Sequence, residues 1–415
     1  PTSTHFTLAN HTEVNESGQQ YIAYIFAHDD QSFGTDSDEA IIKCGSYTGN
    51  GSTQTIDLGF EPQWVMAKRT NDSGNWNIYD IMRGMAASSD DAVLAANTSS
   101  TEFASVNFLH PTATGFQINT SNGAINNTSD SYVYVAIRRP HKPLEVATEV
   151  FATDTQNSGP YNAPPYYRSG FVVDAQLLLY ETGTSSAFPW ISSRLTGIRN
   201  LVTAITSAED NNSTINKWDF MNGFSGGEIF ADDSKHVSHM FRRAPGFFDV
   251  VAYTGTGSAR TISHNLTVKP ELIITKPRNY SDGWGVQARP LGATKRIRLD
   301  LVNAASTNSG YWNNTEPTSS VFTVGTDNAT NGNTYNYIGY LFASLSGVSK
   351  IGTYTGTGSN IGVDCGFTAG ARFVMIKRTD SSGDWYVYDS HRGIVGGNDP
   401  YLLLNEYDAE VTNTD

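Results

Sequence analysis

A serine, two histidines and two groups of acidic residues are the side chains whose types and spacing could do chemistry in this sequence. Ser225 lies in Gly223-Phe-Ser-Gly-Gly227, which matches the pattern of a nucleophile exposed by a sharp strand-to-helix turn. The acid and base that follow, Asp232 and His236, stand too close in sequence for the usual order, and no helical pattern follows the serine. We therefore expect an ordinary glycine-rich loop and a protein that is not an enzyme.

The histidines and the acidic groups raise the question of a metal. His236 and His239 are spaced for a shared ligand, but their i, i+3 spacing would place them on opposite faces of a strand. The stretches Asp36-Ser-Asp-Glu39 and Asp380-Ser-Ser-Gly-Asp384 offer carboxylate oxygens to Ca²⁺, although neither follows the calcium-loop pattern. We expect no cofactor; Ca²⁺ is the alternative to solvated turns at these two places.

Three tryptophans recur in similar contexts and form the most consistent side-chain signal. Trp76, Trp284 and Trp385 each follow an apolar segment that ends in lysine. One interpretation is a core anchor. The other is an exposed aromatic platform for sugar rings, to which Tyr79 and Tyr388 would contribute.

Two of these tryptophans are followed by the same polar pattern. Asp80 precedes Arg83 at the same spacing as Asp389 precedes Arg392, whereas the segment after Trp284 lacks both residues. We expect ion pairs that brace loops, since one copy manages without them.

Self-similarity organises the whole chain. A Tyr-Thr-Gly-x-Gly-Ser string occurs three times with a period of about 100 residues, and a double-length gap after the first occurrence indicates a hidden copy. Each string precedes an apolar segment ending in lysine. The strings and segments are Tyr47–Ser52 with Trp64–Lys68, Tyr253–Ser258 with Leu272–Lys276, and Tyr354–Ser359 with Phe373–Lys377.

A second signature marks the last third of each copy. A segment that opens with Pro-Thr precedes a strand-like run, and this combination occurs at Pro111–Phe116 with Tyr132–Ile137, at Pro317–Phe322 with Tyr337–Phe342, and at Pro1–Phe6 with Tyr21–Phe26. In the hidden copy, Phe171–Leu179 corresponds to the apolar segment and Trp190 to the tryptophan.

These signatures predict the domain boundaries. Residues 1–38 are the C-terminal part of a truncated repeat plus a linker, 41–140 and 247–345 are complete repeats, 146–245 is a diverged repeat, and 348–415 is the first two thirds of a further one. Either the incomplete ends belong to a longer array, or the terminal part of one chain completes the first part of the next by donor-strand complementation.

Composition predicts that each repeat is all-β. Hydrophobic residues make up 38% and charged residues 16%, and Gly, Asn, Ser and Thr fill the gaps between short apolar runs, as in many short strands joined by turns. We expect an elongated tandem array of jelly-roll-like β-sandwiches, each with its own core. The Thr-Gly-x-Gly-Ser string predicts a hairpin turn, and the spacing of Leu195, Ile198, Leu201, Val202 and Ile205 predicts one short amphipathic helix.

Charge and hydropathy exclude two classes of partner. A net charge of -14 with 27 basic residues leaves no basic stripe for a nucleic acid. There is no apolar run of about 18 residues, so we expect no membrane insertion. Cys44 and Cys365 fall at different places in the repeat, where other copies carry aliphatic residues, so we expect small buried hydrophobes and no disulfide or metal pair.

The combination of Tyr354–Ser359, Phe373-Val-Met-Ile-Lys-Arg-Thr379 and Trp385-Tyr-Val-Tyr-Asp389 resembles repeats of large virion proteins of marine bacteriophages, which are described as tail-fibre-like or structural. The resemblance covers all the complete copies, strongly in the first and last and weakly in the 146–245 copy, and it carries no catalytic residues. It implies a location on the virion surface or outside the cell, with other virion subunits, copies of the same chain or a host surface glycan as partners.

The sequence thus predicts a non-enzymatic structural and adhesive repeat protein of a virion surface appendage such as a tail fibre. One alternative is a secreted bacterial adhesin or filament-forming surface protein. A second is an array of carbohydrate-binding modules.

Overall fold

The computed structural model describes residues 4–34, 39–87, 91–155, 164–180, 189–210, 216–226, 236–394 and 399–412. Its regular structure is almost entirely antiparallel β, and the α-helices are single turns: α1 (Thr12–Asn15), α2 (Ser309–Trp312) and α3 (Asn328–Asn331). The prediction of an all-β chain is confirmed. The physical basis is the alternation of short β-branched and aromatic runs with Gly- and Asn-rich turns. None of the described helices has the length and apolar character needed to cross a membrane.

The first unit comprises β1 to β9 and consists of two facing sheets. The large sheet has the order β1-β9-β3-β4-β5-β6, and the small one has the order β2-β8-β7. The strands are β1 (Ile42–Thr48), β2 (Gln54–Asp57), β3 (Pro62–Arg69), β4 (Asn77–Asp80), β5 (Asp91–Ala95), β6 (Phe103–Val106), β7 (Leu109–Thr112), β8 (Gly115–Ile118) and β9 (Ser131–Arg138). Val65, Tyr79, Phe116 and Tyr134 belong to the core between the sheets.

The third unit, β17 to β24, repeats this strand order. Its large sheet is β17-β24-β19-β20-β21-β22, and β18 pairs with β23 in the small sheet. The elements are β17 (Phe248–Thr254), β18 (Arg260–Ser263), β19 (Leu272–Pro277), β20 (Gly285–Ala288), η4 (Arg289–Leu291), β21 (Lys295–Arg298), β22 (Ser306–Thr307), β23 (Val321–Val324) and β24 (Asn336–Phe342). Tyr253 lies opposite Tyr337 as Tyr47 lies opposite Tyr132, and the rings of both pairs stack with centroids 5.0 Å apart.

The second and fourth units are smaller. In the second, the large sheet is β10-β16-β12-β13-β14 and β11 pairs with β15; in the fourth, the described strands form the sheet β25-β26-β27. The elements are η1 (Ala147–Glu149), β10 (Phe151–Thr155), β11 (Tyr167–Arg168), β12 (Ala175–Tyr180), β13 (Trp190–Ser193), η2 (Arg194–Thr196), β14 (Leu201–Val202), β15 (Gly223–Phe224), β16 (His236–Phe241), β25 (Phe373–Lys377), β26 (Trp385–Asp389) and β27 (Leu402–Leu403).

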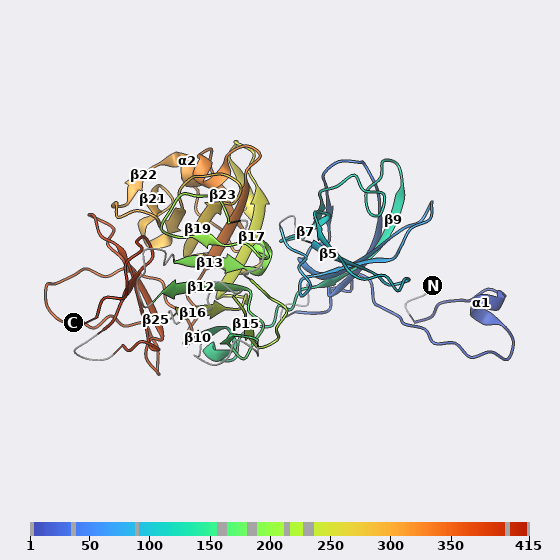
Figure 1. The fold of residues 1–415 in the computed structure, drawn as a ribbon, viewed down its shortest axis with the longest axis horizontal. Coiled ribbons are helices and arrows are strands. Elements are labelled where there is room, and N and C mark those ends of the chain that lie inside the picture. Colours follow the sequence, from blue (N-terminus) through green and yellow to red (C-terminus); the bar gives the residue numbers. More distant parts are fainter. Residues whose placement is uncertain are drawn as a thin grey trace.

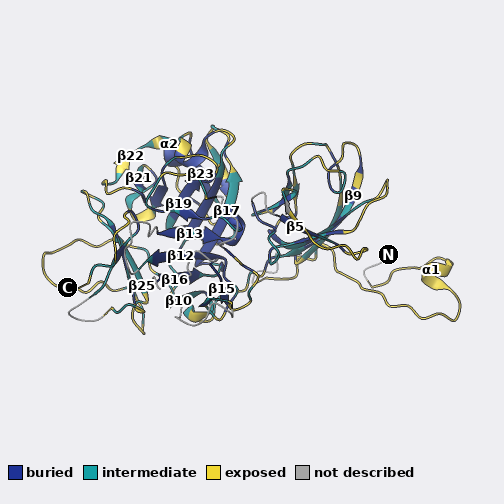
Figure 2. Ribbon diagram, viewed as in Figure 1, coloured by how far each residue is buried: buried dark blue, intermediate teal, exposed yellow. Residues whose placement is uncertain are grey.

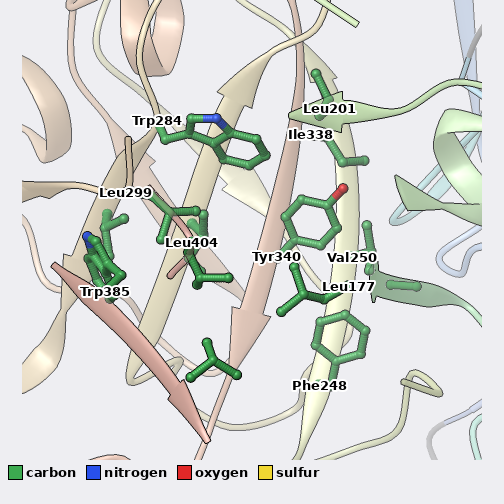
Figure 3. Close-up of a cluster of buried hydrophobic side chains, with 14 of the residues drawn as sticks. Leu177, Leu201, Phe248, Val250, Trp284, Leu299, Ile338, Tyr340, Trp385 and Leu404 are labelled. Atoms are coloured by element: carbon green, nitrogen blue, oxygen red, sulfur yellow. The ribbon is translucent and has the colours of Figure 1, made fainter. Parts of the chain in front are cut away.

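The large sheets of the last three units meet through their outer faces. Figure 1 shows these units grouped together, with the first unit to one side. Side chains of all three sheets form one shared core, which includes Leu177 of β12, Tyr340 of β24 and Trp385 of β26 (Figure 3). The expected string of modules with entirely separate cores is therefore wrong for this part of the chain. Strands β12 and β24 are buried on both faces, as continuous apolar runs require.

Two local predictions are also wrong. The Thr-Gly-x-Gly-Ser string is not a hairpin turn, because β1 and β2 on either side of it belong to different sheets; it is the corner where the chain crosses between sheets. The predicted helix from Leu195 to Ile205 is replaced by η2 and β14, because Leu201 and Val202 pair with β13. Tertiary pairing has overridden the local helical spacing.

The two cysteines are free and half-buried. Cys44 lies opposite Val135 in β1, the place that Val250 occupies opposite Tyr340 in the third unit. Val250 is fully buried in the shared core, whereas no described sheet covers Cys44 from outside. The expectation of two buried thiols is therefore wrong for both, although the predicted equivalence of Cys44 with Val250 is confirmed.

Candidate functional site: the junctions around the shared core

The three recurring tryptophans have the same backbone environment. In each, the backbone N–H donates a hydrogen bond to a side-chain oxygen on the next strand or loop: Trp76 to Asn97 at 2.9 Å, Trp284 to Asp300 at 3.1 Å and Trp385 to Asn405 at 2.8 Å. Equivalent hydrogen bonds at equivalent positions place the three residues at one recurring point of the sheet.

Their side chains differ in burial. Trp284 and Trp385 are 0% and 3% exposed, while Trp76 is 37% exposed. The indole N–H of Trp284 donates to the carbonyl of Val202 at 3.0 Å, and that of Trp385 donates to Arg298 at 2.9 Å. Each buried tryptophan thus binds the backbone of the preceding unit, and Figure 3 shows both facing the shared core.

The predicted aromatic platform does not form at most of its residues. Tyr79, Trp284 and Trp385 are buried, so they present no ring face to a sugar. Tyr388 is half-buried beside Tyr401, with ring centroids 5.9 Å apart. Trp76 alone of the five is exposed, because no described sheet packs on the outer face of the first unit.

The second unit has no tryptophan at the recurring point. Thr203 donates its backbone N–H to the carbonyl of Pro189, just as Leu404 donates to Trp385. Pro189 therefore occupies the position, and the assignment of Trp190 is wrong by one residue. Because successive strand residues point to opposite faces, Trp190 enters the core of the second unit instead of the shared core.

The lysines that end the apolar segments make parallel contacts. Lys276 donates to the carbonyls of Thr206 at 2.9 Å and Asp282 at 2.7 Å. Lys377 donates likewise to Val302 and Gly383. In both cases one carbonyl belongs to the preceding unit. Burial lowers the pKa of Lys276 to about 8.

A buried histidine and a buried aspartate connect the second and fourth units. His239 Nε2 lies 3.1 Å from Asp389 Oδ2, and both side chains are fully buried. Asp389 also pairs with Arg392 Nε at 2.7 Å. Burial lowers the pKa of His239, although the hydrogen bond to Asp389 acts in the opposite direction. The pKa of Asp389 is lowered even though burial alone would raise it, because His239 and Arg392 stabilise the carboxylate.

The predicted loop-bracing ion pairs are confirmed. Arg83 lies 2.5 Å from Asp80, and the backbone N–H of Arg83 donates to the same carboxylate. Asp389 makes the matching contacts with Arg392. The sequence did not reveal that Asp389, unlike Asp80, also contacts another unit.

Buried charges of both signs lie between the first three units. Arg243 Nη1 donates to both carboxylate oxygens of Glu61 at 2.8 and 2.9 Å, and its Nε lies 3.4 Å from Asp174. Arg139 lies near Glu61 and Asp249. Burial alone would raise the pKa of Asp174, but the neighbouring arginines lower it. The charges neutralise one another, as burial requires.

The described residues that were candidates for catalysis or metal binding make contacts typical of a folded core. Ser225 is buried, and its hydroxyl accepts a hydrogen bond from the backbone N–H of Tyr166 at 3.2 Å. His236 packs edge-on against Tyr180. Gly227 and Asp232 lie outside the described residues, so the full arrangement around Ser225 is not described.

The described ranges contain no group of three or more His, Cys, Asp or Glu side chains placed to hold a metal ion. Asp380 pairs with Arg378 at 2.9 Å, and Asp384 accepts a hydrogen bond from Asn405 at 2.8 Å. Asp36 and Asp38, which belong to the other Ca²⁺ candidate, lie outside the described residues.

Sequence reasoning missed a pair of buried asparagines. Asn331 Nδ2 donates to the carbonyls of Ser258 and Gly325 at 2.7 and 2.6 Å, and its Oδ1 accepts from the N–H of Thr256. Asn126 makes the same set of contacts with Ser52, Thr120 and Asn50. Each asparagine stands at the same spacing before the stacked tyrosine of its unit, which is the signal that could have revealed it.

A family model described as "Domain of unknown function (DUF7483)" matches residues 1–140 and 191–415. No curated protein matches the chain.

Proposed function

The chain belongs to the family described as Domain of unknown function (DUF7483), and we propose that it is a non-enzymatic structural and adhesive protein of a virion surface appendage, such as a tail fibre. The observation that carries this proposal is that a residue recurring from unit to unit makes the contact between units: the recurring tryptophan binds the preceding unit at both Trp284 and Trp385. Contacts of this kind fix one unit against the next, as a structural protein requires.

Repetition of the module is part of the proposal. The large sheets of the first and third units share one strand order, and the tyrosine stack, the asparagine contacts and the tryptophan hydrogen bond recur with the same geometry. These features support reading 41–140, 146–245, 247–345 and 348–415 as copies of one module. A repeated module lengthens a surface structure without requiring a new fold.

The polar groups buried at the junctions support a mechanical role. His239 with Asp389 and Arg243 with Glu61 join different units and are withdrawn from solvent. Buried ion pairs require precise geometry to offset the cost of desolvation, so they favour one relative orientation of the units. A fixed orientation suits an appendage that must project from a particle.

The proposed location on the virion surface can be tested with purified virions. If the proposal is right, purified virions of the phage that carries this sequence contain the chain, as detected by mass spectrometry, and antibodies against the chain label an appendage in electron micrographs. Detection only in a cell-surface fraction of bacteria would instead support the alternative of a secreted adhesin or filament subunit.

Adhesion to glycans has one supporting observation, the exposed ring of Trp76. Aromatic faces bind sugar rings by stacking, so a glycan contact belongs on the outer face of the first unit. A glycan array probed with the chain and with Trp76→Ala tests this contact, and unchanged binding by the variant would remove it. An array of equivalent carbohydrate-binding sites is disfavoured, because Trp284 and Trp385 are buried.

A further inference from the structure

We infer that the stacked tyrosines Tyr280 and Tyr335, at one loop end of the third unit, form a binding platform for a sugar ring of a neutral glycan. The inference adds a second, independent site to the adhesive role proposed above, and it does not depend on the virion location. Three observations carry it: an exposed ring held in place by a second ring, polar atoms at the edge of the stack, and an ion-paired cluster at the same place in the first unit.

The two rings join two loops of the third unit. Tyr280 follows β19 and Tyr335 precedes β24, and their rings stack with centroids 4.0 Å apart and an interplanar angle of 10°. A Cβ at Gly332 would collide with the ring of Tyr335, so this inner ring lies directly against the backbone. Tyr280 is 39% exposed. Because Tyr335 covers one face of the Tyr280 ring, the exposed area belongs to the outer face and the edges.

A pair of hydrogen bonds identifies the same place in the first unit. Asn279 Oδ1 accepts a hydrogen bond from the backbone N–H of Asn336 at 2.8 Å. The matching bond in the first unit runs from the N–H of Ser131 to Asn71 Oδ1 at 3.1 Å. The residues next to these in sequence therefore correspond, Tyr280 to Asp72 and Tyr335 to Asp130.

In the first unit this place holds charged residues. Arg69 Nη2 lies 2.9 Å from Asp72 and 2.6 Å from Asp130, and so bridges the two carboxylates. The third unit has Pro277 in place of Arg69, after the lysine that ends the apolar segment. Three differences together replace an ion-paired cluster by an aromatic stack, while the strand order of the large sheet stays the same. The module does not require the stack, so the exposed ring needs a separate explanation.

Polar atoms lie at one end of the stack. Burial, the hydrogen bond with the Tyr280 hydroxyl and the charge of Asp282 all raise the pKa of Tyr335. The Tyr335 hydroxyl therefore keeps its proton at neutral pH and lies near both the other hydroxyl and a carboxylate. Sugar hydroxyls donate and accept hydrogen bonds, and phenolic O–H groups with a carboxylate can satisfy both roles.

The surroundings of Tyr280 favour a small ring ligand over a protein surface. The side chains next to the two tyrosines in sequence are exposed and polar: Asn279, Ser281, Asn333 and Thr334. Figure 2 shows exposed loops beyond the buried strands β17 and β19. A stable protein–protein interface buries about 1,200–2,000 Å² around an apolar centre, which one aromatic ring among polar side chains does not supply.

A pyranose ring matches this arrangement in size and chemistry. One of its faces carries C–H groups and can stack on an aromatic face, while its hydroxyls lie around the rim. The carboxylate of Asp282 and the net charge of -14 favour a neutral sugar over an anionic one. A neutral glycan is therefore the ligand class that the site fits.

The first experiment probes an array of neutral and sialylated oligosaccharides with the full chain, followed by calorimetric titration of the neutral oligosaccharide that binds most strongly. Tyr280→Ala is expected to weaken that binding at least about tenfold, because it removes the exposed ring. Tyr280→Phe keeps the ring and should retain most of the affinity. Tyr407→Ala is the matched control, since Tyr407 is 38% exposed in another unit, and it should bind as the unmodified chain does.

The second experiment installs the cluster of the first unit in the third. The triple variant Pro277→Arg, Tyr280→Asp, Tyr335→Asp is expected to keep the thermal unfolding midpoint within a few degrees, because the module forms with either set of residues, and to lose the binding. Retained binding in a folded triple variant would overturn the inference.

The remaining outcomes separate this site from the proposed function. Absence of binding to every neutral oligosaccharide, or binding confined to sialylated ones, would overturn the platform. Binding that is lost in Trp76→Ala and kept in Tyr280→Ala would also overturn it, but would leave the proposed adhesive role intact on the first unit. Binding at Tyr280 by a protein that is absent from virions would contradict only the proposed location.

Discussion

His239 Nε2 and Asp389 Oδ2 lie 3.1 Å apart with both side chains fully buried, and this contact joins β16 of the second unit to β26 of the fourth. The ring of His239 also packs against Phe373 of β25, with centroids 5.0 Å apart. Polar groups in an apolar core need hydrogen-bond partners, because an unpaired buried group carries a large desolvation cost. The pair therefore specifies how these two sheets meet, and it gives the first prediction.

Asp389→Ala is expected to destabilise the chain by about 3–5 kcal/mol, because it leaves His239 and Arg392 without their buried partner. The matched control is Asp80→Ala, which removes the same loop contact with Arg83 in a partly exposed place. Urea unfolding followed by tryptophan fluorescence measures both. Equal losses in the two variants would show that the contact between units adds nothing.

The same pair predicts a dependence of stability on pH. Because burial lowers the pKa of His239, the unfolded chain binds a proton at this residue when the folded chain does not. The free energy of unfolding should therefore fall as the pH drops below about 6.5, the ordinary pKa of histidine. Asp389 contributes no slope there, because its pKa is lowered from an already acidic value.

The measurement is the urea midpoint between pH 7 and pH 5 in the unmodified chain and in His239→Gln, which keeps a hydrogen-bond donor without titrating. As the pH falls, the urea midpoint should decrease less steeply in the variant than in the unmodified chain. His264 and His141, whose pKa values burial lowers to about 4 and about 3, contribute slope equally to both proteins. Identical slopes would assign the pH dependence to these other histidines.

The equivalent tryptophans should respond unequally to truncation. Trp385→Ala leaves a cavity in the shared core and is expected to cost about 3–5 kcal/mol. Trp76→Ala removes a side chain that is 37% exposed, so a much smaller loss is expected. Differential scanning calorimetry of the two variants gives the comparison, and a larger loss for Trp76→Ala would contradict the assignment of the shared core.

The charges between the first three units give a fourth prediction. Arg243→Met removes the partner of Glu61 and Asp174 and is expected to destabilise the junction by about 3–5 kcal/mol. Arg378→Met breaks only the exposed pair with Asp380 and should leave the unfolding midpoint unchanged. Limited proteolysis locates the effect: cleavage in the connector around residue 140 should accelerate in Arg243→Met alone.

Asn331 and Asn15 stand at the same spacing before Tyr337 and Tyr21, but Asn331 is buried and Asn15 is exposed. Asn331→Ala removes three hydrogen bonds inside the third unit and should lower its thermal midpoint. Asn15→Ala removes a contact in an exposed segment and should leave the midpoint unchanged. An equal fall of the thermal midpoint in both variants would contradict the structural role assigned to the buried asparagine.

Local sequence was enough to predict several elements. Short apolar and aromatic runs bounded by glycine and asparagine predicted the strands, and the pairing of Asp80 with Arg83 followed from spacing within one loop. The equivalence of Cys44 with Val250 also followed from alignment alone, and the structure places both at the same point of β1 and β17. These features depend on neighbours close in the chain or on recurrence.

The sequence by itself determined that this chain is built of β-strands in a recurring order of apolar segments and glycine-rich corners. Only the tertiary structure decided which sheet faces are covered. The run Trp64–Lys68 is as apolar as Leu272–Lys276, yet β3 shows alternating burial and β19 is buried almost throughout. The reason is that apolar side chains on both faces of a strand permit burial, but a second sheet must be present to produce it. For that reason Trp76 and Trp385 have the same sequence context and backbone contacts but opposite exposure.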